Sequence, residues 1–184
     1  MSKSYVTTLL AVALFAATSC SSSPPPPPTD RRPLGDVTAP PAEAECGILA
    51  RHAIARALGR DDFHASGSTS VAHFSYCVIS RSPAFEEKGA LMSIELHNPF
   101  PSTLDALQNS KVADKGTDLP ADAGPGYSAP YKDADGNAIG AQARAWTQDV
   151  TKVLDIKIVR GGPGRDHKAD IEEFVRQLRP LLLS

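Results

Sequence analysis

The sequence has little of what marks several large classes of protein. Aromatic residues make up 6% of the 184-residue chain, cysteine occurs three times, and the formal net charge is only −2. Basic residues are interspersed with acidic ones, which gives no reason to expect nucleic acid as a partner. The longest uncharged, mostly apolar run is 13 residues, at 5–17. That is too short to cross a bilayer, which takes about 20 residues.

Motifs that carry known chemistry are also missing. The chain has no Cys-x-x-Cys, His-Glu-x-x-His or Gly-x-Ser-x-Gly spacing. Residues 133–137 begin like a calcium loop, but the glycine comes two positions early and Arg144 stands where an acid is needed, so we predict a turn. Residues 160–166 are glycine-rich without the lysine of a phosphate-binding loop, and predict a strand-to-helix turn. His97, beside Glu95, is typical of a solvated surface histidine. We expect no catalytic residue, no metal site and no cofactor.

What is present begins at the N-terminus. Lys3 is followed by the apolar run and then by small residues, the layout of a signal peptide, which we place at 1–19. Residues 17–20, Ala-Thr-Ser-Cys, resemble the bacterial lipobox, in which the cysteine is lipidated and becomes the new N-terminus. Cys20 is therefore the expected lipid anchor, and more than one acyl chain would give stable membrane attachment. The alternative is ordinary secretion with Cys20 as a stray thiol.

Proline dominates the next segment. Pro24–Pro28 favour an extended polyproline II spacer. We predict that residues 20–42 form the lipidated cysteine and a proline-rich tether, and that 43–184 form one domain.

The other two cysteines are Cys46 and Cys77. An exported chain meets an oxidising compartment, which favours a disulfide between them. The bond would close a 31-residue loop, a contribution of about 3 to 4 kcal/mol in the chain-entropy model. Two buried thiols are the alternative. A metal site is disfavoured because the intervening histidines lack metal-ligand spacing.

Hydrophobic periodicity predicts the elements of the domain. Helices are expected at 42–58, at 103–111 after a Ser102 cap with Leu104 and Leu107 facing inward, and from Asp166 until Pro180 ends or kinks the helix. Strands are expected at 70–80, 89–97, 138–148 and 152–160, with a long loop at 114–137. This order indicates an α+β fold: an antiparallel sheet of about four to five strands with helices packed on one face.

One face of the 138–148 strand offers a candidate binding surface. Trp146 lies there with Gln142 and Arg144, opposite the alanines of the same strand. If solvent reaches this face, Trp146 and the loop residues Tyr127 and Tyr131 form an apolar patch that suits a partner. If helices cover it, Trp146 belongs to the core.

The chain resembles the small actinobacterial lipoproteins grouped as a domain family of unknown function. The matching residues are Cys20, Cys46 with Leu49, the run 57–59, "FSYC" ending at Cys77, and the strand "DIKIV" before the final helix. The aromatic residue usual after the second cysteine is Val78 here. The resemblance implies an exported, disulfide-closed α+β domain and no established activity.

These observations favour a lipoprotein held at the extracytoplasmic face of the bacterial cell membrane, acting as a non-catalytic binding or regulatory module. Its expected partners are the membrane, through the anchor, and an envelope protein, a cell-wall component or a sensor domain. One alternative is a carrier of a small ligand or lipid, which requires an apolar cavity between helices and sheet. The weaker alternative is a hydrolase, which requires a histidine within hydrogen-bond reach of a serine or cysteine.

Overall fold

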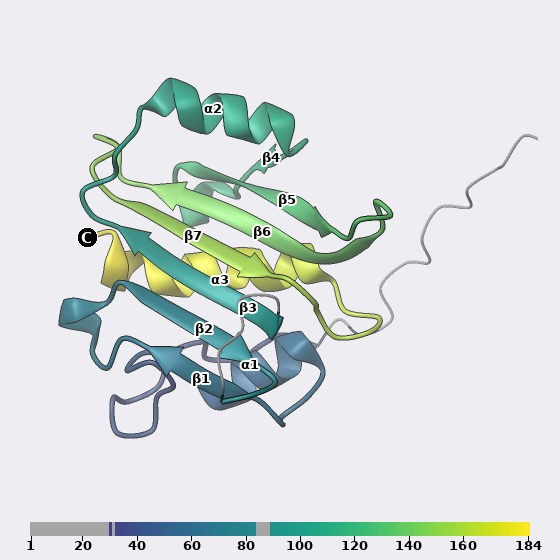
Figure 1. The fold of residues 1–184 in the computed structure, drawn as a ribbon. Coiled ribbons are helices and arrows are strands. Elements are labelled where there is room, and N and C mark those ends of the chain that lie inside the picture. The colour runs from purple at the N-terminus through teal and green to yellow at the C-terminus, as the bar shows by residue number, and fades with distance from the viewer. Residues whose placement is uncertain (1–29, 31, 84–88) are drawn as a thin grey trace, which may run out of the picture.

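The computed structural model of the chain describes residues 30, 32–83 and 89–184. Across these residues seven strands form one antiparallel sheet, and three α-helices pack against it (Figure 1). The helices are α1 (Arg51–Leu58), α2 (Leu104–Ala113) and α3 (His167–Leu182). The strands are β1 (His64–Gly67), β2 (Tyr76–Ser80), β3 (Ala90–His97), β4 (Thr117–Asp118), β5 (Gly126–Lys132), β6 (Ala138–Trp146) and β7 (Val153–Ile158). The α+β class with an antiparallel sheet is confirmed, with seven strands in place of four to five.

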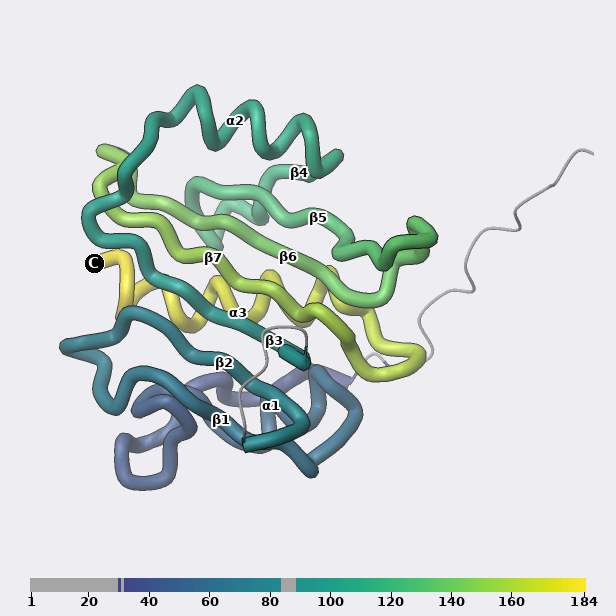
Figure 2. The backbone as a smooth tube through the Cα atoms, viewed as in Figure 1, coloured from purple at the N-terminus to yellow at the C-terminus, as the bar shows by residue number. Residues whose placement is uncertain are grey.

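Two strand meanders meet at the centre of the sheet. The strand order is β1-β2-β3-β7-β6-β5-β4, so β1–β3 form one meander and β4–β7 the other. They join through β3 and β7, where Met92 pairs with Ile158 and His97 with Val153. The connection between the meanders carries α2, and Figure 2 follows this path through the backbone. The two outermost strands, β1 and β4, are short, which limits edge-to-edge pairing.

The main core lies between the sheet and the helices α1 and α3. Alternate residues of the strands point to this inner face, among them the alanines of β6 and Ile156 of β7. Phe174 and Leu178 of α3 pack against them and are fully buried. The space between helices and sheet is filled by these side chains.

The expectation that helices pack on one face only is wrong. A second, smaller core lies on the outer face, where α2 covers β5 and the neighbouring end of β6. Its buried members are Leu107, Tyr127, Ala129, Trp146 and Val153. Leu107 alone is buried in α2, while Leu104, expected to face inward, is largely exposed. The helix begins at Leu104, and its cap is Thr103 rather than Ser102, because the Thr103 hydroxyl accepts a hydrogen bond from the Ala106 amide.

The folded part of the chain begins earlier than residue 43. Asp30 and residues 32–37, here called the N-terminal strap, pack against α1 and α3. Leu34 and Val37 are fully buried in the main core. This part of the predicted tether therefore belongs to the domain, because Leu34 and Val37 are buried against the helices. The predicted signal peptide, Cys20 and the proline run lie outside the described residues.

The first predicted helix is shorter than expected, because residues 42–50 form turns. Cys46 and Gly47 both have positive φ, at 51° and 71°, which ends any continuous helix there. A Cβ on Gly47 would lie 2.4 Å from the Thr69 backbone, so this close approach requires glycine. Gly59 ends α1 in the left-handed conformation, as the sequence predicts.

The predicted loop at 114–137 contains two strands. β4 and β5 pair with each other, and β5 pairs along its length with β6. Residues 133–137 form the hairpin turn between β5 and β6, where Asp133 accepts from the amides of Asp135 and Asn137. The turn predicted in place of a calcium loop is therefore present.

The last helix runs through its proline. Asp166 caps α3, and its carboxylate accepts from the Ala169 amide. Pro180 was expected to end or kink the helix, but α3 continues to Leu182. Leu182 is buried in the main core, which holds the last turn in place. Residues 160–166 form the predicted turn between β7 and α3.

Candidate functional site

The structure buries two of the three aromatic residues of the candidate binding surface. Trp146 is 5% exposed and Tyr127 1% exposed, and their ring centroids are 6.3 Å apart beneath α2. The Tyr127 hydroxyl donates to Asp114 at 2.8 Å. Burial, helped by this bond, raises the pKa of Tyr127 far above its ordinary value. Tyr131 lies further along β5 and is partly exposed. Trp146 and Tyr127 thus hold α2 on the sheet rather than presenting a surface.

The second site, Cys46 and Cys77, is present as a disulfide. The Cα atoms are 5.7 Å apart, and Cys77 is buried in β2. Cys46 lies in the turn before α1, not inside a helix, so the bond ties the first turns of the domain to the sheet.

The half of the outer face that α2 does not cover is hollowed. The hollow measures about 550 Å³ and lies over the meander β1–β3, at the end of the sheet where β2 begins and β3 ends. It is lined by Ser66 of β1, by Ser75, Tyr76 and Val78, and by Glu95, Leu96 and His97. We call it the β2–β3 hollow. Tyr76, which is 48% exposed, is one of the few exposed large hydrophobic side chains among the described residues.

A row of polar side chains crosses the outer face from this hollow. Sheet register places Tyr76 beside Glu95, Glu95 beside Asp155, and Asp155 beside Arg144. The Asp155 carboxylate is buried, and Arg144 Nε binds it at 2.8 Å. Lys157 Nζ lies 3.8 Å from its other oxygen. The negative charge of Asp155 is therefore balanced by two cations.

Glu95 has no such balance. Among the described residues its one ionic neighbour is His97, with Nε2 and Oε2 3.8 Å apart. Both side chains are partly exposed, and the His97 ring meets the Phe100 ring edge-on at a centroid distance of 6.1 Å. A carboxylate that lies beside a second carboxylate, Asp155, and lacks a close cation favours a positively charged ligand.

The hollow contains serines and a histidine, so it is also the place to look for a nucleophile and base. Within the described part of the chain, no hydrogen bond joins His97 to a serine. Ser75 instead lies 3.4 Å from Ser68, whose hydroxyl accepts from the Ser75 and Tyr76 amides. These serines stabilise the turn before β2.

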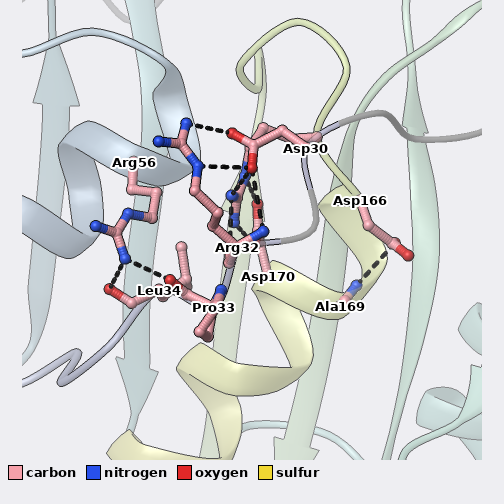
Figure 3. Close-up of polar contacts among 9 residues, drawn as sticks. Asp30, Arg32, Pro33, Leu34, Arg56, Asp166, Ala169 and Asp170 are labelled. Carbon is pink, nitrogen blue, oxygen red and sulfur yellow. Dashed lines mark hydrogen bonds and ion pairs between the residues drawn. The ribbon is translucent and has the colours of Figure 1, made fainter.

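A second polar cluster holds the N-terminal strap to the start of α3 (Figure 3). Arg165 is buried and binds the buried carboxylate of Asp170 through two nitrogens, one of them at 3.0 Å. It also donates to the Arg32 carbonyl at 2.8 Å. Arg56 donates to the carbonyls of Pro33 and Leu34. All of these contacts join residues of the domain to one another. We therefore interpret the cluster as a structural clamp on the strap.

His167, at the first position of α3, adds one unusual atom to this region. Its Nδ1 is buried and has no hydrogen-bond partner among the described residues, and burial lowers the pKa of the ring. Its packing against Gly161 accounts for the position: a Cβ on Gly161 would lie 2.3 Å from the ring.

Sequence reasoning missed Tyr76. The signal was available: alternation in the strand that contains Cys77 places Tyr76 on the face opposite the core. His97 and Glu95 were recognised as outward-facing, and the structure adds that they share a hollow with Tyr76.

The described ranges contain neither a metal-ligand cluster nor a membrane-spanning helix. Within the described ranges, no three His, Cys, Asp or Glu side chains lie close enough together to hold a metal ion. No helix in the same ranges combines the length and apolarity that a membrane crossing requires.

Comparison with protein-family models, with curated proteins and with solved structures gave no match. The resemblance to the actinobacterial lipoproteins stays a prediction.

Proposed function

We propose that this chain is a lipoprotein, anchored through Cys20 at the extracytoplasmic face of the cell membrane, whose domain binds a partner through the β2–β3 hollow. The signal-peptide pattern and lipobox support the anchor, and the disulfide suits an oxidising compartment. The observation that carries the binding role is the uncovered half of the outer face, with Tyr76 exposed beside an unbalanced Glu95.

The packing and hydrogen bonds of the side chains favour partner binding over the two alternatives, a small-ligand carrier and a hydrolase. A carrier needs an apolar cavity between helices and sheet, whereas that space is packed with buried side chains such as Phe174 and Ile156. A hydrolase needs an activated nucleophile, whereas within the described residues no hydrogen bond joins His97 to Ser66 or Ser75, the serines of the hollow. The envelope protein, cell-wall component or sensor domain expected as partner would contact the hollow.

The anchor is tested by intact mass and by fractionation. We expect the membrane-extracted protein to have the mass of residues 20–184 plus acyl chains. Cys20→Ala should move the protein out of the membrane fraction. An unlipidated mass from the membrane fraction would overturn the anchor.

The binding role is tested by photo-crosslinking in intact cells. A photoreactive phenylalanine analogue replaces Tyr76, and a matched chain carries it at Val112, which is 78% exposed on α2. We expect a discrete crosslinked product from position 76 that the Val112 chain does not give. Identical products from the two positions, or none from position 76, would count against the hollow as the binding site.

A further inference from the structure

We propose that the β2–β3 hollow recognises an organic ammonium group of its partner, held between the carboxylate of Glu95 and the ring of Tyr76. This inference rests on the proposed function, because it takes the hollow to be the binding site and names the ligand class.

The first argument is the kind of hydrogen-bonding group that lines the hollow. Glu95 is an acceptor only, and it has no hydrogen bond within the described residues. The hydroxyls of Ser66 and Ser75 accept as well as donate. Of the residues that the structure describes, no lysine or arginine lines the hollow. A ligand with several donors and a positive charge complements this set, and an ammonium group has both.

The second argument is the charge distribution around the hollow. The neighbouring cations, Arg144 and Lys157, are directed to Asp155 across the sheet. Glu95 is thus left as the uncompensated charge at the hollow, with only His97 at 3.8 Å. An anionic ligand would meet this carboxylate and gain no cation in return.

The third argument is the aromatic ring beside the carboxylate. Tyr76 and Glu95 are paired across β2 and β3, so their side chains leave the same face of the sheet as neighbours. A cation over an exposed aromatic face gains roughly 0.5 to 1 kcal/mol, about a twofold to fivefold gain in affinity. A carboxylate and an aromatic face side by side therefore contribute two separate attractions to one ammonium group.

The volume of the hollow suits an ammonium group with a short aliphatic body. The hollow of about 550 Å³ lies within the range of sites that enclose small ligands, roughly 300 to 1,000 Å³. Val78 lines its floor and suits the aliphatic body of such a compound.

The test uses matched pairs of probes with the detergent-solubilised full chain. Cadaverine is compared with 1,5-pentanediol, and choline with 3,3-dimethylbutan-1-ol, so each pair differs in the cationic group. Dissociation constants are measured by ligand-observed NMR titration, with detergent alone as the blank. We expect cadaverine to bind about tenfold or more tightly than 1,5-pentanediol, as charge-assisted hydrogen bonds allow. Choline has no N–H donor, so its gap should come from the charge and the Tyr76 ring alone and be smaller. The pair that shows the larger gap tells a primary amine from a quaternary one.

Three variants locate the site. Glu95→Gln should abolish the gap between the pair members, and Tyr76→Leu should weaken the cation about threefold. Glu43→Gln, an exposed carboxylate at a distant position, should change neither. Equal binding within both pairs, or an unchanged gap in Glu95→Gln, would overturn the inference. If position 76 still gives its specific crosslink in that case, the binding function stands and the ligand class is wrong; loss of the crosslink as well would remove both.

Discussion

Two substitutions in the clamp compare how much a buried and an exposed ion pair contribute to stability. The buried pair is Arg165–Asp170, and the exposed pair beside it is Arg32–Asp30. In Arg165→Met, the carboxylate of Asp170 keeps its buried position and loses both guanidinium hydrogen bonds. Removing one partner of a buried pair typically costs about 3 to 5 kcal/mol. The variant should lose that much of the free energy of unfolding, measured by urea denaturation at about pH 7. Arg32→Met is the matched control, because Arg32 also pairs with an aspartate, Asp30, but is exposed, and its loss should leave stability nearly unchanged.

The pH dependence of the same variant tests the cause. Burial raises the pKa of Asp170, and the ion pair with Arg165 opposes that rise. Without Arg165 the pKa of Asp170 rises further, so the folded variant takes up a proton more readily than the unfolded chain. Protonation removes the uncompensated charge, and the stability deficit should shrink as the solution is taken from about pH 7 to about pH 5.

A control background isolates Asp170 from the titrating groups next to it, Asp166 and His167. Asp170→Asn is introduced both into the protein with Arg165 and into the Arg165→Met variant. In this background the stability cost of Arg165→Met should no longer depend on the titration of Asp170. A deficit of the same size at both pH values in the Asp170 chain would refute the reasoning. So would a loss in Arg165→Met no larger than that in Arg32→Met.

Three further predictions follow from burial. Leu34→Ala should lower the free energy of unfolding by about 2 to 5 kcal/mol, whereas Val112→Ala should change it by about 0.5 kcal/mol or less. Equal effects would show that the strap is not part of the folded domain. Replacing Cys46 and Cys77 by alanine should cost about 3 to 4 kcal/mol, and an unchanged urea midpoint would contradict this. Trp146 fluorescence should resist acrylamide quenching until the domain unfolds, so strong quenching of the native protein would contradict its burial.

The regular elements of the domain could be predicted because their patterns are local. β3, β7 and α3 have clear periodicities of two or 3.6 residues, and the structure places all three where expected. β5 was hidden by its composition, which includes Gly126 and Pro130. Proline is tolerated there because β4 pairs with β5 only at Tyr127 and Ser128, so Pro130 lies on an open edge and no partner needs its missing N–H. The partner strand, not the local sequence, determines this element.

The two faces of the sheet could not be assigned from single segments. α2 offers one buried side chain, Leu107, which is too weak a stripe to show which surface it covers. Whether Trp146 is exposed depends on that helix, and so the sequence left the question open. The N-terminal strap was misassigned for a similar reason. Its carbonyls are bound by Arg56 and Arg165, which are distant in sequence, and nothing within the strap itself indicates them.

The strap and the β2–β3 hollow lie at opposite ends of the sheet, and this has a consequence for the proposed anchor. The Asp30 amide donates to Gly164, in the turn that follows the Ile158 end of β7. The hollow lies at the other end, where His97 pairs with Val153. Along β3 the positions Met92 and His97, which mark these ends, are separated by about 17 Å of strand. From Cys20 to Asp30 an extended chain reaches at most about 36 Å. Because this reach exceeds the distance between the two ends, a lipid on Cys20 would keep the start of the strap within about 36 Å of the membrane and would leave the end with Tyr76 and Glu95 free to face away from it.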